Sequence, residues 1–268
     1  MNTSENQESF TIPGAKQWRL TGSSGVDYRI MIWAPDTPVP EGGYPILYLL
    51  DGNAAFGTMV ETVRLLGRGP YRIEPSIVVG IGYETDEPLH TERRFYDYTV
   101  YASVDELPAR KVNTPWPLTG GAESFLLFIE QELKPLIEQN YNVNRRKQTL
   151  FGHSLGGFFV LYTLFMKHDA FQYYVAGSPS IWWKQGYIKP YTEQFIEAGL
   201  SEVVHASLYL GVGSLEKPHM ISDAKQMYER LNQAAIPGFH VQHHCFEDEG
   251  HLSVIPSLIS RAVRFAQG

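Results

Sequence analysis

Short apolar runs recur along the chain, and the longer segments between them have apolar residues spaced as on one side of a helix. The runs are nearly continuous, which is typical of strands buried on both faces of a sheet. They lie at 44–51, 76–83, 148–152, 173–180, 206–213 and 240–248. The segments with helical spacing lie at 54–67, 122–139, 155–168, 218–235 and 252–266. Because strand and helix alternate, the pattern predicts a mostly parallel sheet with helices on both faces.

Two further apolar runs near the start of the chain predict a hairpin. They are QWRLT at 17–21 and YRIMIWAP at 28–35, with a glycine-containing loop between them. We expect these two strands at an edge of the sheet, which then has about eight strands. The chain contains no internal repeat or linker, so residues 1–268 are predicted to form a single α/β domain.

Residues 84–121 interrupt the alternation of strands and helices. This stretch contains four prolines, several tyrosines and arginines, and Trp116, with little periodicity. A long irregular segment inside a compact domain is usually functional or disordered, and this one is too aromatic for disorder. We therefore expect 84–121 to be an irregular insertion that forms a wall of a binding site.

Composition narrows the classes of protein to which the chain can belong. The 268 residues are 43% apolar and carry a formal net charge of −7. An acidic balance argues against binding to nucleic-acid phosphates or anionic membranes. The chain shows no leader pattern and no membrane-spanning run, so we expect a cytoplasmic protein. A single cysteine, Cys245, excludes an internal disulfide and a multi-cysteine metal site.

A serine between glycines lies where a predicted strand meets a predicted helix. Gly152, Ser154 and Gly156 form a Gly-x-Ser-x-Gly pattern in the stretch TLFGHSLGGFF. In a strand-to-helix turn of this form, the serine hydroxyl projects above the sheet and the glycines let neighbouring backbone approach. The five residues alone are a weak signal, but the strand before them and the helix after them supply the required context. We predict that Ser154 is a nucleophile, against the alternative of a tight structural turn.

A serine nucleophile needs a histidine that accepts its proton. His251 lies in the loop between the last predicted strand and the last helix, at the same edge of the sheet as the serine turn. We therefore predict His251 as the base among nine histidines. His243 and His244 lie inside a strand, and His153, next to the serine, is expected to support the turn.

An acid that orients the histidine should lie between serine and histidine in chain order. Glu216 follows the strand LYLGVG and is the first choice, with Asp223 in reserve. Asp223 falls on the following helix, where its charge is also explained by the helix dipole. Three acids lie just before His251 and are either surface charges or a substitute for Glu216; they are Glu247, Asp248 and Glu249. A further alternative is a Ser–His pair that works without an acid.

An oxyanion develops when a serine attacks a carbonyl carbon, and it needs two backbone N–H donors. Leu155, the residue after the nucleophile, is predicted to supply one. Asn53 is predicted to supply the other, because it lies in the loop DGNAAF where a strand ends and a helix begins, and N–H groups at a helix start are free. Gly52 is expected to allow the tight turn.

Several longer stretches resemble the α/β-hydrolase esterases that include enterochelin, salmochelin and, most closely, bacillibactin trilactone esterases. The matching stretches begin at about residue 14 and include LYLLDGNAAF, RRFYDYTV, FGHSLGGFFVLYTL, GSPSIWW, GVGSLE and EGHLSV. The resemblance implies an α/β-hydrolase fold and a serine esterase that cleaves the ester backbone of a catecholate siderophore, such as bacillibactin or enterobactin, to release iron. It places the nucleophile on Ser154, the base on His251 and, less securely, the acid on Glu216.

A ferric tris-catecholate is bulky, aromatic and anionic, so an acidic protein must gather cations and flat side chains to bind it. Arginine suits planar anionic groups. The residues expected at the pocket are Arg68, Arg72, Arg93, Arg94, Trp116, Trp182 and Trp183. One of the two adjacent arginines is expected to pair with Asp97. The chemistry itself needs no metal or organic cofactor, and iron arrives with the substrate.

Two other functions remain open from the sequence. One is a carboxylesterase or thioesterase for small acyl substrates, similar to S-formylglutathione hydrolases or sugar deacetylases. The more remote one is a ligand-binding protein without catalytic activity, because fold alone does not guarantee activity. A complete set of serine, histidine and acid argues against the second.

Overall fold

The structure, a computed structural model that describes residues 9–68, 72–109 and 114–267, contains one sheet. Its strands are β1 (Ala15–Thr21), β2 (Asp27–Trp33), β3 (Tyr44–Leu49), β4 (Ile77–Gly82), β5 (Val143–His153), β6 (Tyr173–Gly177), β7 (Ser207–Gly213) and β8 (His240–Phe246). Their order is β1-β2-β4-β3-β5-β6-β7-β8. The β1–β2 and β2–β4 pairs are antiparallel, and all other pairs are parallel. The predicted eight-stranded, mostly parallel sheet with an edge hairpin is confirmed.

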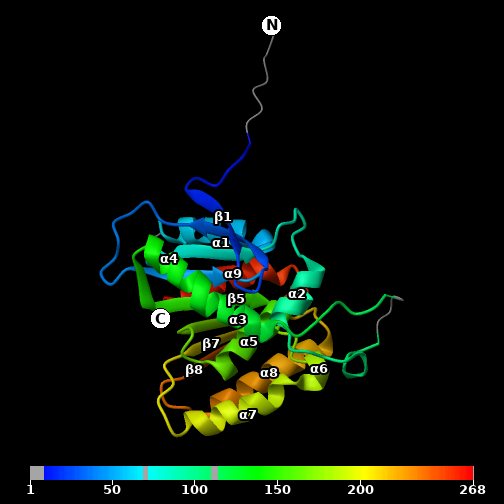
Figure 1. Cartoon of the computed structure of the whole chain (residues 1–268). Helices are drawn as coiled ribbons and strands as arrows, with labels where there is room; N and C mark the ends of the chain where they lie inside the picture. Colours follow the sequence, from blue (N-terminus) through cyan, green and yellow to red (C-terminus); the bar gives the residue numbers. More distant parts are fainter. Residues whose placement is uncertain (1–8, 69–71, 110–113, 268) are drawn as a thin grey trace.

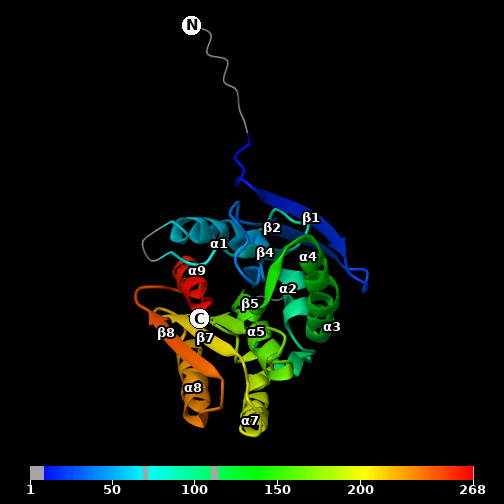
Figure 2. The same ribbon diagram turned by 90° about the vertical axis from the view of Figure 1, so that its left-hand side faces the viewer.

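Helices cover both faces of the sheet (Figures 1 and 2). On one face α1 (Gly52–Leu66) packs against α9 (Val254–Phe265). The other face carries α3 (Ala122–Phe128), α4 (Lys134–Asn140), α5 (Leu155–Met166), α7 (Ile188–Gly199) and α8 (Pro218–Ala234). A π-helical turn joins α3 and α4 into the long helix predicted at 122–139. Within the described residues, no helix is long and apolar enough to cross a membrane.

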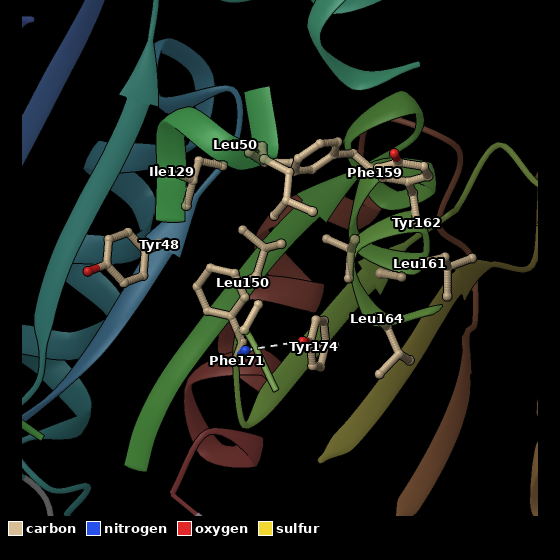
Figure 3. Close-up of a cluster of buried hydrophobic side chains, with 14 of the residues drawn as sticks. Tyr48, Leu50, Ile129, Leu150, Phe159, Leu161, Tyr162, Leu164, Phe171 and Tyr174 are labelled. Atoms are coloured by element: carbon tan, nitrogen blue, oxygen red, sulfur yellow. Dashed lines mark hydrogen bonds between the residues drawn. The ribbon is translucent and has the colours of Figure 1, made fainter. Parts of the chain in front are cut away.

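The apolar runs fill two cores, one on each face of the sheet. Successive side chains of a strand point to opposite faces, so Tyr48 and Leu150 join the core under α5 while Leu49 and Phe151 join the core under α1 and α9. Figure 3 shows part of the first core. All six residues of β3 and of β4 are buried, which explains why these strands read as continuous apolar runs.

Among the described residues, helices α2 (Thr91–Tyr98) and α7, together with the short helix α6 (Trp183–Gly186) and a 3-10 turn at Val104–Glu106, lie where the sequence pattern indicated none. Helix α2 lies inside the segment expected to be irregular, and its buried residues are Arg94, Asp97 and Tyr98. Because this helix buries charged, ion-paired side chains, its sequence lacks the regular spacing of apolar residues by which a helix is predicted. Helix α7 begins two residues before Pro190, which reads as a helix breaker but is tolerated in a first turn. The remaining part of 84–121 is mostly irregular, and its residues 110–113 lie outside the described residues.

The carboxyl ends of the parallel strands meet at one edge of the sheet, as in other open α/β sheets. Asp51 follows β3, Ser154 follows β5, Ser178 follows β6, Glu216 follows β7 and His251 follows β8. These side chains are far apart in the sequence, and the parallel topology gathers the segments that carry them.

Candidate active site

Ser154 lies at a sharp turn between β5 and α5. Its backbone has a positive φ, with φ 60° and ψ −115°, a conformation that costs free energy in a residue other than glycine. Its N–H donates to Gly177 O at 2.8 Å. A Cβ on Gly152 would lie 2.4 Å from Gly156 O, and one on Gly157 would lie 2.7 Å from Gly177 O. The glycines are therefore needed because α5 starts in direct backbone contact with β5 and β6.

His251 connects Ser154 to Glu216. Its Nε2 lies 3.0 Å from Ser154 Oγ, and its Nδ1 lies 2.6 Å from Glu216 Oε2. With the proton on Nδ1, His251 donates to the carboxylate and Nε2 accepts from the serine hydroxyl. The Glu216 side chain is only 1% exposed, whereas His251 is 40% exposed. This hydrogen-bonded series has the geometry that makes a serine hydroxyl nucleophilic.

Three donors hold the Glu216 carboxylate. Ser178 Oγ and the Gly213 N–H donate to Oε1, and His251 uses the other oxygen. Burial alone would raise the pKa of Glu216, but the hydrogen bonds from His251, Ser178 and Gly213 more than offset burial, so its pKa lies below the ordinary value. The acid is therefore ionised at neutral pH. Ser178 keeps a left-handed φ of 40°, and sequence reasoning did not identify it.

His153 packs directly against the histidine of this series. The two rings lie 4.6 Å apart. Burial, and next the neighbouring His251, lower the pKa of His153 to about 3. His153 therefore stays neutral and supports His251 by contact without adding a second charge.

Two free N–H groups lie at the starts of α5 and α1. Among the described residues, neither the Leu155 N–H nor the Asn53 N–H has a hydrogen-bond partner. The Asn53 side chain accepts from the Tyr83 N–H at 2.8 Å and donates to two carbonyl groups, which ties α1 to the segment after β4. Gly52 is required by close packing, since a Cβ there would lie 2.9 Å from the Gly80 carbonyl carbon. Free donors at these two positions can stabilise an oxyanion.

A cavity of about 690 Å³ opens beside Ser154. Arg94, Trp116 and Trp182, all predicted for the pocket, line it. The 84–121 insertion, expected to form a wall of a binding site, supplies five of the residues that line this cavity; they are Arg94, Phe95, Pro108, Ala109 and Trp116. Sequence reasoning missed Lys217 and His219, which line it at the start of α8. The one available signal was their position directly after Glu216.

Arg94 is part of a buried ion pair. Its Nε and Nη2 donate to the two carboxylate oxygens of Asp51 at 2.6 and 3.0 Å. The Asp51 N–H donates to Tyr98 OH at 3.0 Å, and Tyr98 OH donates to Asp51 Oδ1 at 3.3 Å. Arg94 therefore fixes the turn that precedes α1, and Asp51 compensates its charge.

Four residues predicted for the pocket lie elsewhere. Arg68 follows the far end of α1, about 20 Å from Asn53 by the rise of a 15-residue helix, and it lines a separate cavity. Arg72 lies between α1 and β4 in the sequence and is not among the residues that line the cavity beside Ser154. Arg93 pairs with Asp97 at 2.6 Å, the pairing expected for one of the two arginines. Trp183 is fully buried. These placements correct the predicted pocket, because side chains adjacent in sequence point to different surroundings.

The two adjacent tryptophans should respond differently to substitution. Trp183→Ala removes a large buried side chain, so we expect a loss of about 3–5 kcal/mol and a melting temperature lower by about 10 °C. Trp182→Ala removes a half-buried wall of the cavity, so we expect a higher KM for an aromatic ester and a melting temperature within a few degrees of wild type. Thermal melts and steady-state kinetics on both variants check this. The reverse assignment of the two effects would contradict it.

Within the described residues, no three His, Cys, Asp or Glu side chains lie close enough to hold a metal ion. Among the described residues, the candidate site combines the hydrogen-bonded Ser154, His251 and Glu216 with two N–H groups without partners and an aromatic cavity. That set of groups matches the requirements of acyl transfer through a serine.

Comparison with known proteins agrees with this chemistry. The Esterase family model matches residues 21–252. The chain is 44% identical over 264 residues to the ferri-bacillibactin esterase BesA of Bacillus subtilis, covering 96% of this chain and 91% of that protein. It is 32% identical over 238 residues to a siderophore enterobactin esterase of Emericella nidulans, covering 83% and 78%.

Solved structures agree with the fold as well. The BES protein from Bacillus cereus matches with a TM-score of 0.93 and 38% identity, covering 98% of this chain and 99% of that chain. The enterobactin and salmochelin hydrolase IroE matches with a TM-score of 0.72 at 24% identity, which supports the fold alone. The predicted α/β-hydrolase fold is thereby confirmed. The chain belongs to the Esterase family and is a carboxylic ester hydrolase.

Proposed function

We propose that this protein hydrolyses the trilactone ester bonds of a catecholate siderophore of the bacillibactin or enterobactin type. The observation that carries the proposal is the Ser154–His251–Glu216 hydrogen-bonded series beside an aromatic cavity with a positively charged wall. The names of the relatives support the substrate class, since a ferri-bacillibactin esterase and an enterobactin esterase are among them.

The reaction proceeds through an acyl-enzyme. His251 Nε2 takes the proton of Ser154 Oγ as the oxygen attacks the ester carbonyl carbon, and the N–H groups of Leu155 and Asn53 stabilise the oxyanion. His251 then gives that proton to the leaving alcohol. Water, deprotonated by His251, attacks the acyl-enzyme and releases the carboxylic acid and free Ser154. Glu216 stabilises the imidazolium in both halves of the reaction.

The iron belongs to the siderophore substrate, and the cavity beside Ser154 binds the organic part of that substrate. Trp116 and Trp182 offer flat surfaces for catechol rings beside the nucleophile. A trilactone that is opened and cut into monomers no longer holds its three catechols together, which weakens its grip on iron. We place this activity in the cytoplasm. The chain has a single cysteine and so cannot form an internal disulfide, which is typical of proteins in that reducing compartment.

Mass spectrometry of the trilactone after incubation with the protein tests the substrate. We expect linear trimer, dimer and monomer to appear in steps. An intact trilactone beside rapid cleavage of a small nitrophenyl ester would instead point to small acyl substrates. A protein inert toward both esters and fluorophosphonates would point to ligand binding without catalysis.

Glu216→Gln tests whether the acid is essential. The change keeps the size of the side chain but removes the charge that stabilises the imidazolium, so we expect kcat to fall by about 10²–10⁴-fold. Asp223→Asn is the matched control, because Asp223 pairs with Lys189 at 2.9 Å outside the hydrogen-bonded series. Steady-state kinetics on both variants decide between a triad and a Ser–His pair. A loss of less than threefold in Glu216→Gln would favour the pair.

A further inference from the structure

One lysine lines the cavity without a counter-charge. Lys217 is exposed and lies just before α8, and among the described residues its ammonium has no ion pair or hydrogen bond. Arg94, the second permanent cation among the described lining residues, is paired with Asp51. The cavity lining contains no acid in the described part of the chain. Among the described residues, the wall therefore carries one uncompensated positive charge, in a protein of net charge −7.

The neighbouring acid does not neutralise this lysine. Glu216 precedes Lys217 in the sequence, but its carboxylate is buried and already engaged by Ser178, Gly213 and His251. Lys217 also caps the start of the 17-residue helix α8, where the helix dipole adds positive potential. The loop that holds the acid thus also places Lys217 at the cavity.

Metal loading changes the charge of a catecholate substrate. Free catechol groups are neutral at neutral pH, whereas a bound metal ion favours loss of their protons. When three catechols bind one ferric ion, each loses both protons, and the complex carries a net negative charge that the metal-free form lacks. A cation in the cavity wall therefore attracts one form of the substrate much more than the other.

We propose that Lys217 is a specificity-determining residue that makes the enzyme favour the metal-loaded siderophore over the metal-free one. The inference rests on the proposed function and adds to it a preference between two forms of one substrate. Contacts with Trp116 and Trp182 serve both forms, since both carry the same rings. The charge contact favours the metal-loaded form, which carries the net negative charge.

The test compares kcat/KM for ferric and metal-free trilactone in the wild type and in three variants. We expect Lys217→Gln to lower the ratio of the two values about tenfold, equivalent to about 1.4 kcal/mol, and Lys217→Arg to keep most of it. Lys225→Gln is the matched control, because it removes the same charge from α8 at a residue outside the cavity that pairs with Glu229 at 3.7 Å. It should leave the ratio as in the wild type.

Ionic strength supplies a second readout that a structural role of Lys217 would not change. Salt screens an exposed charge contact, so raising the salt concentration should raise the wild-type KM for the ferric form and change the Lys217→Gln value less. An unchanged ratio in Lys217→Gln, or equal losses for both substrates, overturns the inference. Wild-type protein that cleaves neither trilactone refutes the proposed function itself, and this result is distinguishable because it precedes any comparison of variants.

Discussion

Ser154→Ala should lower kcat for ester hydrolysis by about 10⁴–10⁶-fold, because a methyl group cannot form the acyl-enzyme. Substrate binding should change little, since the cavity walls and the free N–H groups of Leu155 and Asn53 remain. Residual activity is expected from those donors, which still stabilise an oxyanion when water attacks directly. Single-turnover kinetics and a binding titration with intact substrate measure the two effects separately.

Covalent labelling provides the control for this variant. A fluorophosphonate should add its mass to the peptide that contains Ser154 in the wild type and leave Ser154→Ala unlabelled. The melting temperature should stay within a few degrees, because one hydrogen bond to the half-exposed His251 contributes only about 1 kcal/mol. Hydrolysis near the wild-type rate in Ser154→Ala would assign the chemistry to another serine.

The sequence located the residues of the hydrogen-bonded series because parallel topology makes their positions predictable. In a parallel sheet the residue after each strand reaches the same edge. Ser154, Glu216 and His251 each follow an apolar run and occur in the chain order of this type of hydrolase. Ser178 also follows a strand at this edge, but its hydroxyl donates to the Glu216 carboxylate, a role that lies outside the serine, histidine and acid pattern.

The walls of the cavity were less predictable, because charge pairing depends on contacts between distant segments. Arg93 pairs with Asp97 four residues away on the same helix, a spacing that can be read from the sequence. Arg94 pairs with Asp51, which lies 43 residues away, and a pairing at that separation cannot be read from the sequence. Lys217 looked like any surface lysine, and its significance appears only when its lack of a partner is seen beside the cavity.

Gly152→Ala should be strongly damaging although Gly152 is not one of the reacting groups. A Cβ at Gly152 would lie 2.4 Å from Gly156 O and 2.5 Å from its carbonyl carbon, and backbone atoms cannot move aside as a side chain does. We expect a loss of at least about 3 kcal/mol and a melting temperature lower by about 10 °C. Because α5 must shift, Ser154 should also leave hydrogen-bond distance of His251, and kcat should fall.

The second glycine of the motif is the matched control for this effect. A Cβ at Gly156 would meet nothing closer than 3.5 Å, at Leu50. Gly156 lies in the first turn of α5, so Gly156→Ala should leave stability unchanged or raise it by about 0.5–1 kcal/mol. Thermal melts of both variants separate two explanations of the motif. Equal destabilisation would mean that both glycines supply backbone freedom, whereas damage at Gly152 alone means that the motif lets the nucleophile's helix begin in contact with its strand.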